Sequence, residues 1–172
     1  MAILPPINFK KWIDDHRAEL KPPVGAVRVY KEANFIVMVV GGPNARKDYH
    51  LDPGEEFFYQ LEGDMVLKIV EDGQFKDVHI REGEIFLLPP MIPHSPQRLA
   101  GTVGLVIERP RLDTEQDGLR WYCDECGHTL HEAFFAVENL PKQIKEAVDV
   151  FLASDELRTC DKCGHLNTGL PD

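Results

Sequence analysis

The sequence has no long hydrophobic run, little positive charge and only four cysteines, all of them in the last third of the chain. The longest uninterrupted apolar segment, residues 35–40, is far shorter than the roughly 20 residues that a transmembrane helix needs. Residues 1–6 contain two prolines and no basic side chain, unlike a secretory signal peptide. Lysine and arginine total 19 against 29 acidic residues, a net charge of −10, whereas nucleic-acid binding depends on clustered basic residues. We therefore expect a cytoplasmic protein that acts on a small molecule, with no membrane or nucleic-acid partner.

The rest of the composition is that of a globular protein. Hydrophobic residues make up 43% of the 172 positions and charged residues 28%, which excludes a disordered or fibrous chain. This length suits one domain with a small appendage. We expect a β-rich body with an N-terminal helix over residues 1–118 and a cysteine-containing tail over residues 119–172. No Ser/Gly-rich linker separates the two parts, so the tail is expected to pack on the body.

The four cysteines form two C-x-x-C pairs, Cys123 with Cys126 and Cys160 with Cys163. In a reducing compartment, two such pairs predict a tetrathiolate metal site rather than disulfides. A Gly-His dipeptide follows each pair, and glycine lets the backbone turn beneath a metal. Four buried free thiols are the alternative, but they explain neither the repeated spacing nor the glycines. Because four sulfurs complete a tetrahedron, three nearby histidines are not expected to be ligands: His128, His131 and His165.

Short segments with β character fill the region between residues 27 and 107. Each is rich in Val, Ile or Phe, and turn-forming residues separate them. The segments are 27–30, 35–40, 56–61, 65–70, 75–80, 85–88 and 103–107. Many short strands without intervening helices predict an antiparallel barrel or sandwich. Helices are expected at the two ends, one between Asn8 and the Pro22-Pro23 pair, and one that follows Asn139 and continues to Leu152.

Two histidines lie beside turn signals with polar neighbours. His50 is followed by Glu56, a spacing that resembles the first cupin motif, and the stretch that ends at His94 resembles the second. This resemblance implies that the three side chains surround one divalent metal inside the barrel. Two imidazoles and one carboxylate form the facial triad of non-haem Fe(II) oxygenases, which leaves three coordination positions open. Asp52, at the place where many cupins have a second histidine, is an alternative fourth ligand.

Position alone allows more than one role for other charged or ionisable residues. Arg46 precedes His50 by four residues and Arg98 follows His94 by four. Either arginine could form a bidentate pair with a substrate carboxylate or lie on the surface. Glu108 ends an apolar strand, either as a rim charge or as an inward group that meets a substrate proton donor. Surface or packing roles are expected for His16 and His79.

A more specific resemblance is carried by Gly41-Gly42-Pro43-Asn44 with Arg46, Asp48-Tyr49-His50, Glu56-Phe57-Phe58-Tyr59-Gln60, Pro93-His94-Ser95-Pro96-Gln97-Arg98, Ile107-Glu108-Arg109 and Trp121-Tyr122-Cys123. Together these segments resemble the 3-hydroxyanthranilate 3,4-dioxygenase family over nearly the whole chain. The tail matches the bacterial and fungal form, in which it is rubredoxin-like. One departure is Ala26, at a position where the family usually has asparagine.

The resemblance implies a mainly β cupin fold, a jelly-roll barrel with a short N-terminal helix and a four-cysteine tail that contains one helix. The implied reaction opens the ring of 3-hydroxyanthranilate with O2 to give 2-amino-3-carboxymuconate semialdehyde, on the route from tryptophan to nicotinamide cofactors. Implied cofactors are Fe(II) on His50, Glu56 and His94, and a second iron or zinc on the cysteines. Arg98 would bind the substrate carboxylate, Arg46 would lie near the carboxylate and oxygen, and Glu108 would meet the hydroxyl or amine. A homodimer is expected because cupins often pair through strands.

Two other functions fit part of this pattern. A metallocupin isomerase would use the same ligands with zinc or manganese on a sugar phosphate, but it should have more lysine near its site. A binding module would use the tail as a zinc ribbon for protein or nucleic acid, although the net charge of −10 disfavours nucleic acid.

Overall fold

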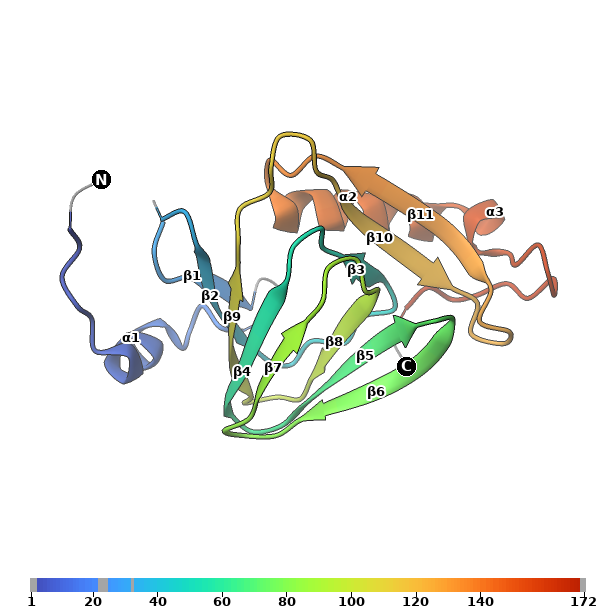
Figure 1. Ribbon diagram of the computed structural model, residues 1–172. Coiled ribbons are helices and arrows are strands. Elements are labelled where there is room, and N and C mark those ends of the chain that lie inside the picture. Colours follow the sequence, from blue (N-terminus) through green and yellow to red (C-terminus); the bar gives the residue numbers. More distant parts are fainter. Residues whose placement is uncertain (1–2, 22–24, 32, 171–172) are drawn as a thin grey trace.

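The computed structural model describes residues 3–21, 25–31 and 33–170. Its strands are β1 Ala26–Arg28, β2 Ile36–Gly41, β3 Tyr49–Leu51, β4 Glu56–Glu62, β5 Met65–Glu71, β6 Gln74–Ile80, β7 Ile85–Leu88, β8 His94–Arg98, β9 Val103–Glu108, β10 Asp117–Tyr122 and β11 Thr129–Phe135. Its helices are α1 Phe9–His16, α2 Leu140–Ala153 and α3 Asp155–Arg158. Figure 1 shows the strands gathered in two sheets, with α1 at one side and α2 against the β10–β11 hairpin.

Strand order identifies the fold as a jelly roll. One sheet has the order β1-β2-β9-β4-β7 and the other β11-β10-β3-β8-β5-β6, and the strand pairings within both sheets are antiparallel. The eight strands from β2 to β9 alternate between the sheets, except that β5 and β6 form a hairpin within one sheet, and this is the double Greek-key arrangement of a jelly roll. The expected mainly β cupin fold is thus confirmed. The expected barrel is not closed: among the described residues, no strand is shared by the two sheets, which form a sandwich.

The core between the sheets comes from side chains that alternate along the strands. In β4, Glu56, Phe58 and Gln60 are buried, and the residues between them are more exposed. Phe58 packs in one cluster with Leu67 and Val106 from the strands opposite and beside it. This period of two is the reason why polar residues at the strand ends also face inward.

Helix α1 packs on the outer face of the five-stranded sheet. The side chain of Asn8 caps it by accepting a hydrogen bond from the backbone N–H of Lys11, as its position predicts. Ile13 and the later Leu20 are buried there against Val39. Pro22 and Pro23, which were expected to end this helix, lie outside the described residues. No helix in the described part of the chain is long and apolar enough to cross a membrane.

The cysteine tail joins the body through a continuous sheet. Strand β10 pairs with β3 of the body on one side and with β11 on the other. Helix α2 covers this hairpin, and Phe151 stacks on Trp121 with their ring centroids 4.6 Å apart. The predicted boundary at residue 118 falls within β10, and the division into body and tail stays a prediction.

Candidate metal centre

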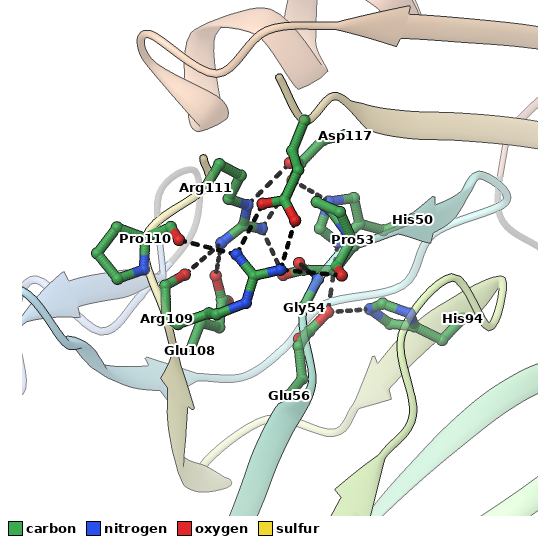
Figure 2. Close-up of polar contacts among 12 residues, drawn as sticks. His50, Pro53, Gly54, Glu56, His94, Glu108, Arg109, Pro110, Arg111 and Asp117 are labelled. Atoms are coloured by element: carbon green, nitrogen blue, oxygen red, sulfur yellow. Dashed lines mark hydrogen bonds and ion pairs between the residues drawn. The ribbon is translucent and has the colours of Figure 1, made fainter. Parts of the chain in front are cut away.

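Three strands bring the predicted triad together. His50 lies in β3, directly opposite His94 at the start of β8, and Glu56 begins β4 in the facing sheet. One ligand atom from each side chain lies within 4.8 Å of the others, and all three residues are buried. Figure 2 shows the Glu56 carboxylate beside both imidazoles. The structure therefore places these three residues where one ion can contact all of them.

The contacts within the triad fit a shared cation better than direct hydrogen bonds. Oε1 of Glu56 lies 2.8 Å from Nε2 of His94 and 3.6 Å from Nδ1 of His50. Yet this buried oxygen has no hydrogen-bond partner of acceptable geometry. Burial raises the pKa of Glu56, but the two imidazoles lower it further, so the carboxylate is ionised. An anionic oxygen beside two ring nitrogens is a donor set suited to a divalent transition metal.

The other ring nitrogen of each histidine is held by an acceptor. Nε2 of His50 lies 2.7 Å from Oδ2 of Asp117, and Nδ1 of His94 lies 3.0 Å from the carbonyl oxygen of Ile92. Because an ionised carboxylate and a carbonyl can only accept, the imidazoles donate these bonds. Burial lowers the pKa of His50, but Asp117 and Glu56 raise it further, to about 9, so its ring carries a second proton when no metal is bound. A metal would take the place of that proton on Nδ1 of His50, the nitrogen that faces Glu56.

Asp52 is engaged elsewhere. Its Oδ1 accepts a hydrogen bond from the backbone N–H of Gly54 at 2.6 Å, and its Oδ2 pairs with the guanidinium of Arg111. Burial and the negative charge of Glu56 raise the pKa of Asp52 to about 7. Both oxygens are therefore occupied, but Asp52 also has an oxygen within 4.8 Å of ligand atoms of Glu56 and Glu108, so its role as an alternative fourth ligand stays a prediction.

Arg111 and Asp117 complete the surroundings of the triad, and the sequence analysis did not single out either of them. The side chain of Arg111 is 7% exposed and contacts Asp52, Glu108 and Asp117. Burial lowers the pKa of Arg111, but its three carboxylate partners raise it further, so the guanidinium is charged. Figure 2 shows it within this group of carboxylates, above Glu56.

Glu108 faces inward rather than lying at the rim. It is buried, and it is the direct cross-strand neighbour of Glu56. Burial and the nearby charge of Glu56 raise its pKa, whereas Arg111 opposes this shift. A carboxylate whose pKa is raised is a stronger proton acceptor than an ordinary one.

Arg98 lies inside the sandwich without a counter-ion. It is 4% exposed, its Nη1 donates to Oε1 of Gln60 at 2.9 Å, and its buried Nε has no hydrogen-bond partner. Among the described residues, no carboxylate forms an ion pair with it. Burial lowers its pKa to about 10, so the guanidinium is still charged at neutral pH. The surface alternative is wrong for this arginine, because a buried and unpaired cation needs an anion.

Arg46 differs from Arg98 because it already has a partner. Its guanidinium pairs with Asp48, and its side chain is 21% exposed. Its backbone carbonyl accepts a hydrogen bond from the side-chain amide of Gln97 at 3.0 Å. Arg46 therefore ties the loop before β3 to β8, the strand that carries His94 and Arg98.

The four cysteines form a second candidate centre. Sγ of Cys123 lies 3.6 Å from that of Cys163, Sγ of Cys126 lies 3.6 Å from that of Cys160, and all four lie within 4.8 Å of one another. These separations are too long for disulfides and close to the ~3.8 Å edge of a tetrahedron with metal–sulfur bonds of about 2.3 Å.

The loops that carry these cysteines are built alike. In each, the first cysteine's N–H donates to the carbonyl five residues on, and its carbonyl accepts from a glycine N–H; these glycines, Gly127 and Gly164, have positive φ. A cavity of about 600 Å³ between the first loop and the β5–β6 hairpin includes no triad residue.

Comparisons with known proteins agree on one family. The sequence profile of the family described as 3-hydroxyanthranilic acid dioxygenase matches residues 1–152. A curated protein named 3-hydroxyanthranilate 3,4-dioxygenase from Xanthomonas euvesicatoria is 56% identical over 165 residues, which cover 96% of this chain and 93% of the relative. One of the same name from Jannaschia sp. is 54% identical over 170 residues, covering 98% and 94%.

Solved structures show more distant similarity. A Neisseria meningitidis protein has a TM-score of 0.47 at 23% identity and covers 62% of this chain and 100% of its own. A cupin-2 domain containing protein from Shewanella frigidimarina has a TM-score of 0.47 at 17% identity and covers 61% and 94%.

Proposed function

Because the chain belongs to the 3-hydroxyanthranilic acid dioxygenase family, we propose that His50, Glu56 and His94 hold the iron with which it opens the aromatic ring of 3-hydroxyanthranilate. The protein is a ring-cleaving dioxygenase, since relatives of this name match nearly its full length. The observation that carries the site assignment is the buried Oε1 of Glu56, which lies 2.8 Å from Nε2 of His94 and 3.6 Å from Nδ1 of His50 and has no hydrogen-bond partner.

The bound metal supplies a centre at which an aminophenol and O2 can be held side by side, because a facial triad leaves three positions open. The triad itself does not choose the substrate. That choice falls to Arg98, whose buried and unpaired guanidinium binds the ring carboxylate through charge-assisted hydrogen bonds. This contact orients the ring and limits its rotation in the site.

Proton transfer falls to Glu108. Its raised pKa and its position opposite Glu56 support a role as the base for the substrate hydroxyl or amine. Arg46 lies near the carboxylate and oxygen in this proposal, and its pairing with Asp48 fixes its guanidinium. Release of 2-amino-3-carboxymuconate semialdehyde completes the reaction on the route toward nicotinamide cofactors.

The tetrathiolate site is proposed to bind a structural iron or zinc. Its four sulfurs leave no open position, so substrate cannot reach the metal. Its metal would join the loop after β10 to the loop after α3, which lie far apart in the sequence.

A homodimer is proposed on the strength of an apolar surface. Ile85 and Leu87 of the edge strand β7 are 65% and 54% exposed, and they pair across the sheet with Tyr59 and Phe57. These four side chains share the outer face of the five-stranded sheet. A cytoplasmic location stays a prediction, supported by the grouping of the four cysteines as a metal site rather than as disulfides.

Oxygen consumption by the purified protein tests this function. With 3-hydroxyanthranilate, we expect O2 uptake that requires added Fe(II) and disappears when zinc replaces it. Activity on a sugar phosphate with zinc or manganese would instead favour the isomerase. Absence of turnover with a fully iron-loaded triad would reject the proposal.

A further inference from the structure

Arg111 contacts three buried carboxylates near the triad, and these carboxylates have different roles. Its Nε and Nη2 donate to the two carboxylate oxygens of Asp117 at 2.8 and 2.7 Å, and its Nη1 donates to Oε2 of Glu108 at 2.5 Å. Nη2 also pairs with Asp52. One planar guanidinium thus holds three buried carboxylates in fixed directions, and Figure 2 shows it among them.

Two of these carboxylates act on the proposed chemistry. Asp117 uses the oxygen that Nη2 contacts, Oδ2, to accept the N–H of His50 at 2.7 Å. Glu108 gives Oε2 to Arg111, and its Oε1 accepts no hydrogen bond from a described residue. Through Asp117, Arg111 therefore fixes the orientation of the His50 imidazole. Through its bond to Oε2 of Glu108, it leaves only Oε1 of that residue for the substrate.

No other cation could replace it in this position. Among the described residues, no lysine and no other arginine forms an ion pair or hydrogen bond with Asp52, Glu108 or Asp117. A lysine at residue 111 could keep the charge, but a single ammonium cannot form the two parallel bonds to Asp117 while it also reaches Glu108.

We propose that Arg111 is a positioning residue that sets the orientation of His50 through Asp117 and the orientation of the Glu108 carboxylate at the same time. This inference rests on the proposed function, since it assigns a supporting role to His50 and Glu108. The metal ligand His50 and the proton acceptor Glu108 would then both depend on Arg111. Substitution of Arg111 should therefore alter metal binding and turnover together.

The test compares Arg111→Lys and Arg111→Gln with Arg109→Gln. Arg109 is the control because it lies two residues from Arg111, its side chain is 39% exposed, and it contacts Glu115 and the carbonyl of Pro53 rather than Asp52, Glu108 or Asp117. We would titrate each variant with Co(II), record the cobalt visible spectrum, and measure kcat and KM with Fe(II). We expect both Arg111 variants to bind Co(II) about 10- to 100-fold more weakly, as loss of support to a ligand usually does. Their cobalt spectra should change, and kcat should fall at least 10-fold with a smaller change in KM, while Arg109→Gln matches the wild type.

If Arg111→Gln fails to fold, Arg111→Lys and Asp117→Asn decide the question, because each keeps more of the local packing. Asp117→Asn removes the charge and one acceptor oxygen from the contacts to His50 and Arg111 but leaves the Arg111–Glu108 pair in place, so it should weaken cobalt binding more than it affects the role of Glu108. Wild-type cobalt affinity, spectrum and kcat in folded Arg111→Lys would overturn the proposal. So would a lower Tm with unchanged spectrum and kcat, since Arg111 would then only stabilise the fold. A wild-type protein without iron-dependent turnover would instead show that the proposed function is wrong.

Discussion

Nε2 of His94 and Oε1 of Glu56 lie 2.8 Å apart without a hydrogen bond between them. The other ring nitrogen of His94, Nδ1, lies 3.0 Å from the carbonyl oxygen of Ile92. Nε2 of His94 and the buried Glu56 carboxylate are thus held at a distance at which one cation can bind both. The fold therefore holds its ligands in an arrangement that a metal stabilises.

The first prediction concerns this pair and its partner His50. His50→Ala or His94→Ala should abolish oxygen consumption and the binding of iron at the triad, while circular dichroism stays that of the folded protein, because each change removes a ligand and not a core apolar group. His79→Ala is the matched control, since His79 is exposed. Normal turnover in either ligand variant would show that the triad is not the catalytic centre.

Arg98 should determine the preference for a carboxylated ring. Arg98→Ala should raise KM for 3-hydroxyanthranilate by about 30-fold to several thousand-fold, because a buried charge-assisted contact contributes on the order of 2–5 kcal/mol. Arg98→Lys should recover only part of the loss.

The same variants should leave the kinetics of 2-aminophenol unchanged, since this compound lacks the carboxylate. Arg81→Ala, which alters an exposed arginine, provides the control. An unchanged KM for 3-hydroxyanthranilate in Arg98→Ala would place the substrate carboxylate elsewhere.

A second variant tests the position of Arg98 without changing its charge. A Cβ atom at Gly104 would lie 2.6 Å from Nη1 of Arg98 and 3.0 Å from Oε1 of Gln60. Gly104→Ala should therefore displace the guanidinium and raise KM for 3-hydroxyanthranilate at least 10-fold, with normal iron content. We would measure KM and iron content on the same preparation. If KM stays at its wild-type value, the guanidinium has room to move and does not depend on this glycine.

The tail should be structural. A Cys160→Ser, Cys163→Ser variant should lose one metal equivalent per chain and unfold at a lower temperature, because ordering of the loops is coupled to metal binding. It should keep measurable ring-opening activity when Fe(II) is supplied. Metal analysis, a thermal melt and an oxygen electrode measure the three effects. A folded variant with a loaded triad and no turnover would reveal a catalytic role for the tail.

Much of the fold follows from local pattern. The seven apolar strands predicted between residues 27 and 107 correspond to β1, β2, β4, β5, β6, β7 and β9. Helices α1 and α2 begin after the predicted capping residues, Asn8 and Asn139. These elements are predictable because alternating apolar side chains and helix caps are local features of a sequence.

The two strands that carry the histidine ligands, β3 and β8, were not predicted, whereas β4, which carries Glu56, was. β3 contains only three residues, and β8 has the sequence His94-Ser95-Pro96-Gln97-Arg98, which has no apolar alternation and includes a proline. Their pairing depends on neighbouring strands rather than on their own propensity. The two histidine ligands therefore lie in strands whose own sequences show little strand pattern.

The metal ligands were predictable because their spacing in the sequence is distinctive. The residues that contact these ligands from the surrounding structure were not. Arg111 follows Arg109 by two residues, and both resemble ordinary surface arginines in the sequence, but only Arg111 turns toward the carboxylates. Asp117 lies 67 positions from His50, so no local signal links them.

The unpaired guanidinium of Arg98 also affects how this enzyme should be assayed. In the absence of substrate, small anions such as phosphate, acetate or chloride are attracted to a buried positive charge that lacks a counter-ion. They should act as competitive inhibitors, so apparent KM values will depend on the choice and concentration of buffer. Kinetic constants from different laboratories will be comparable only after extrapolation to zero buffer anion.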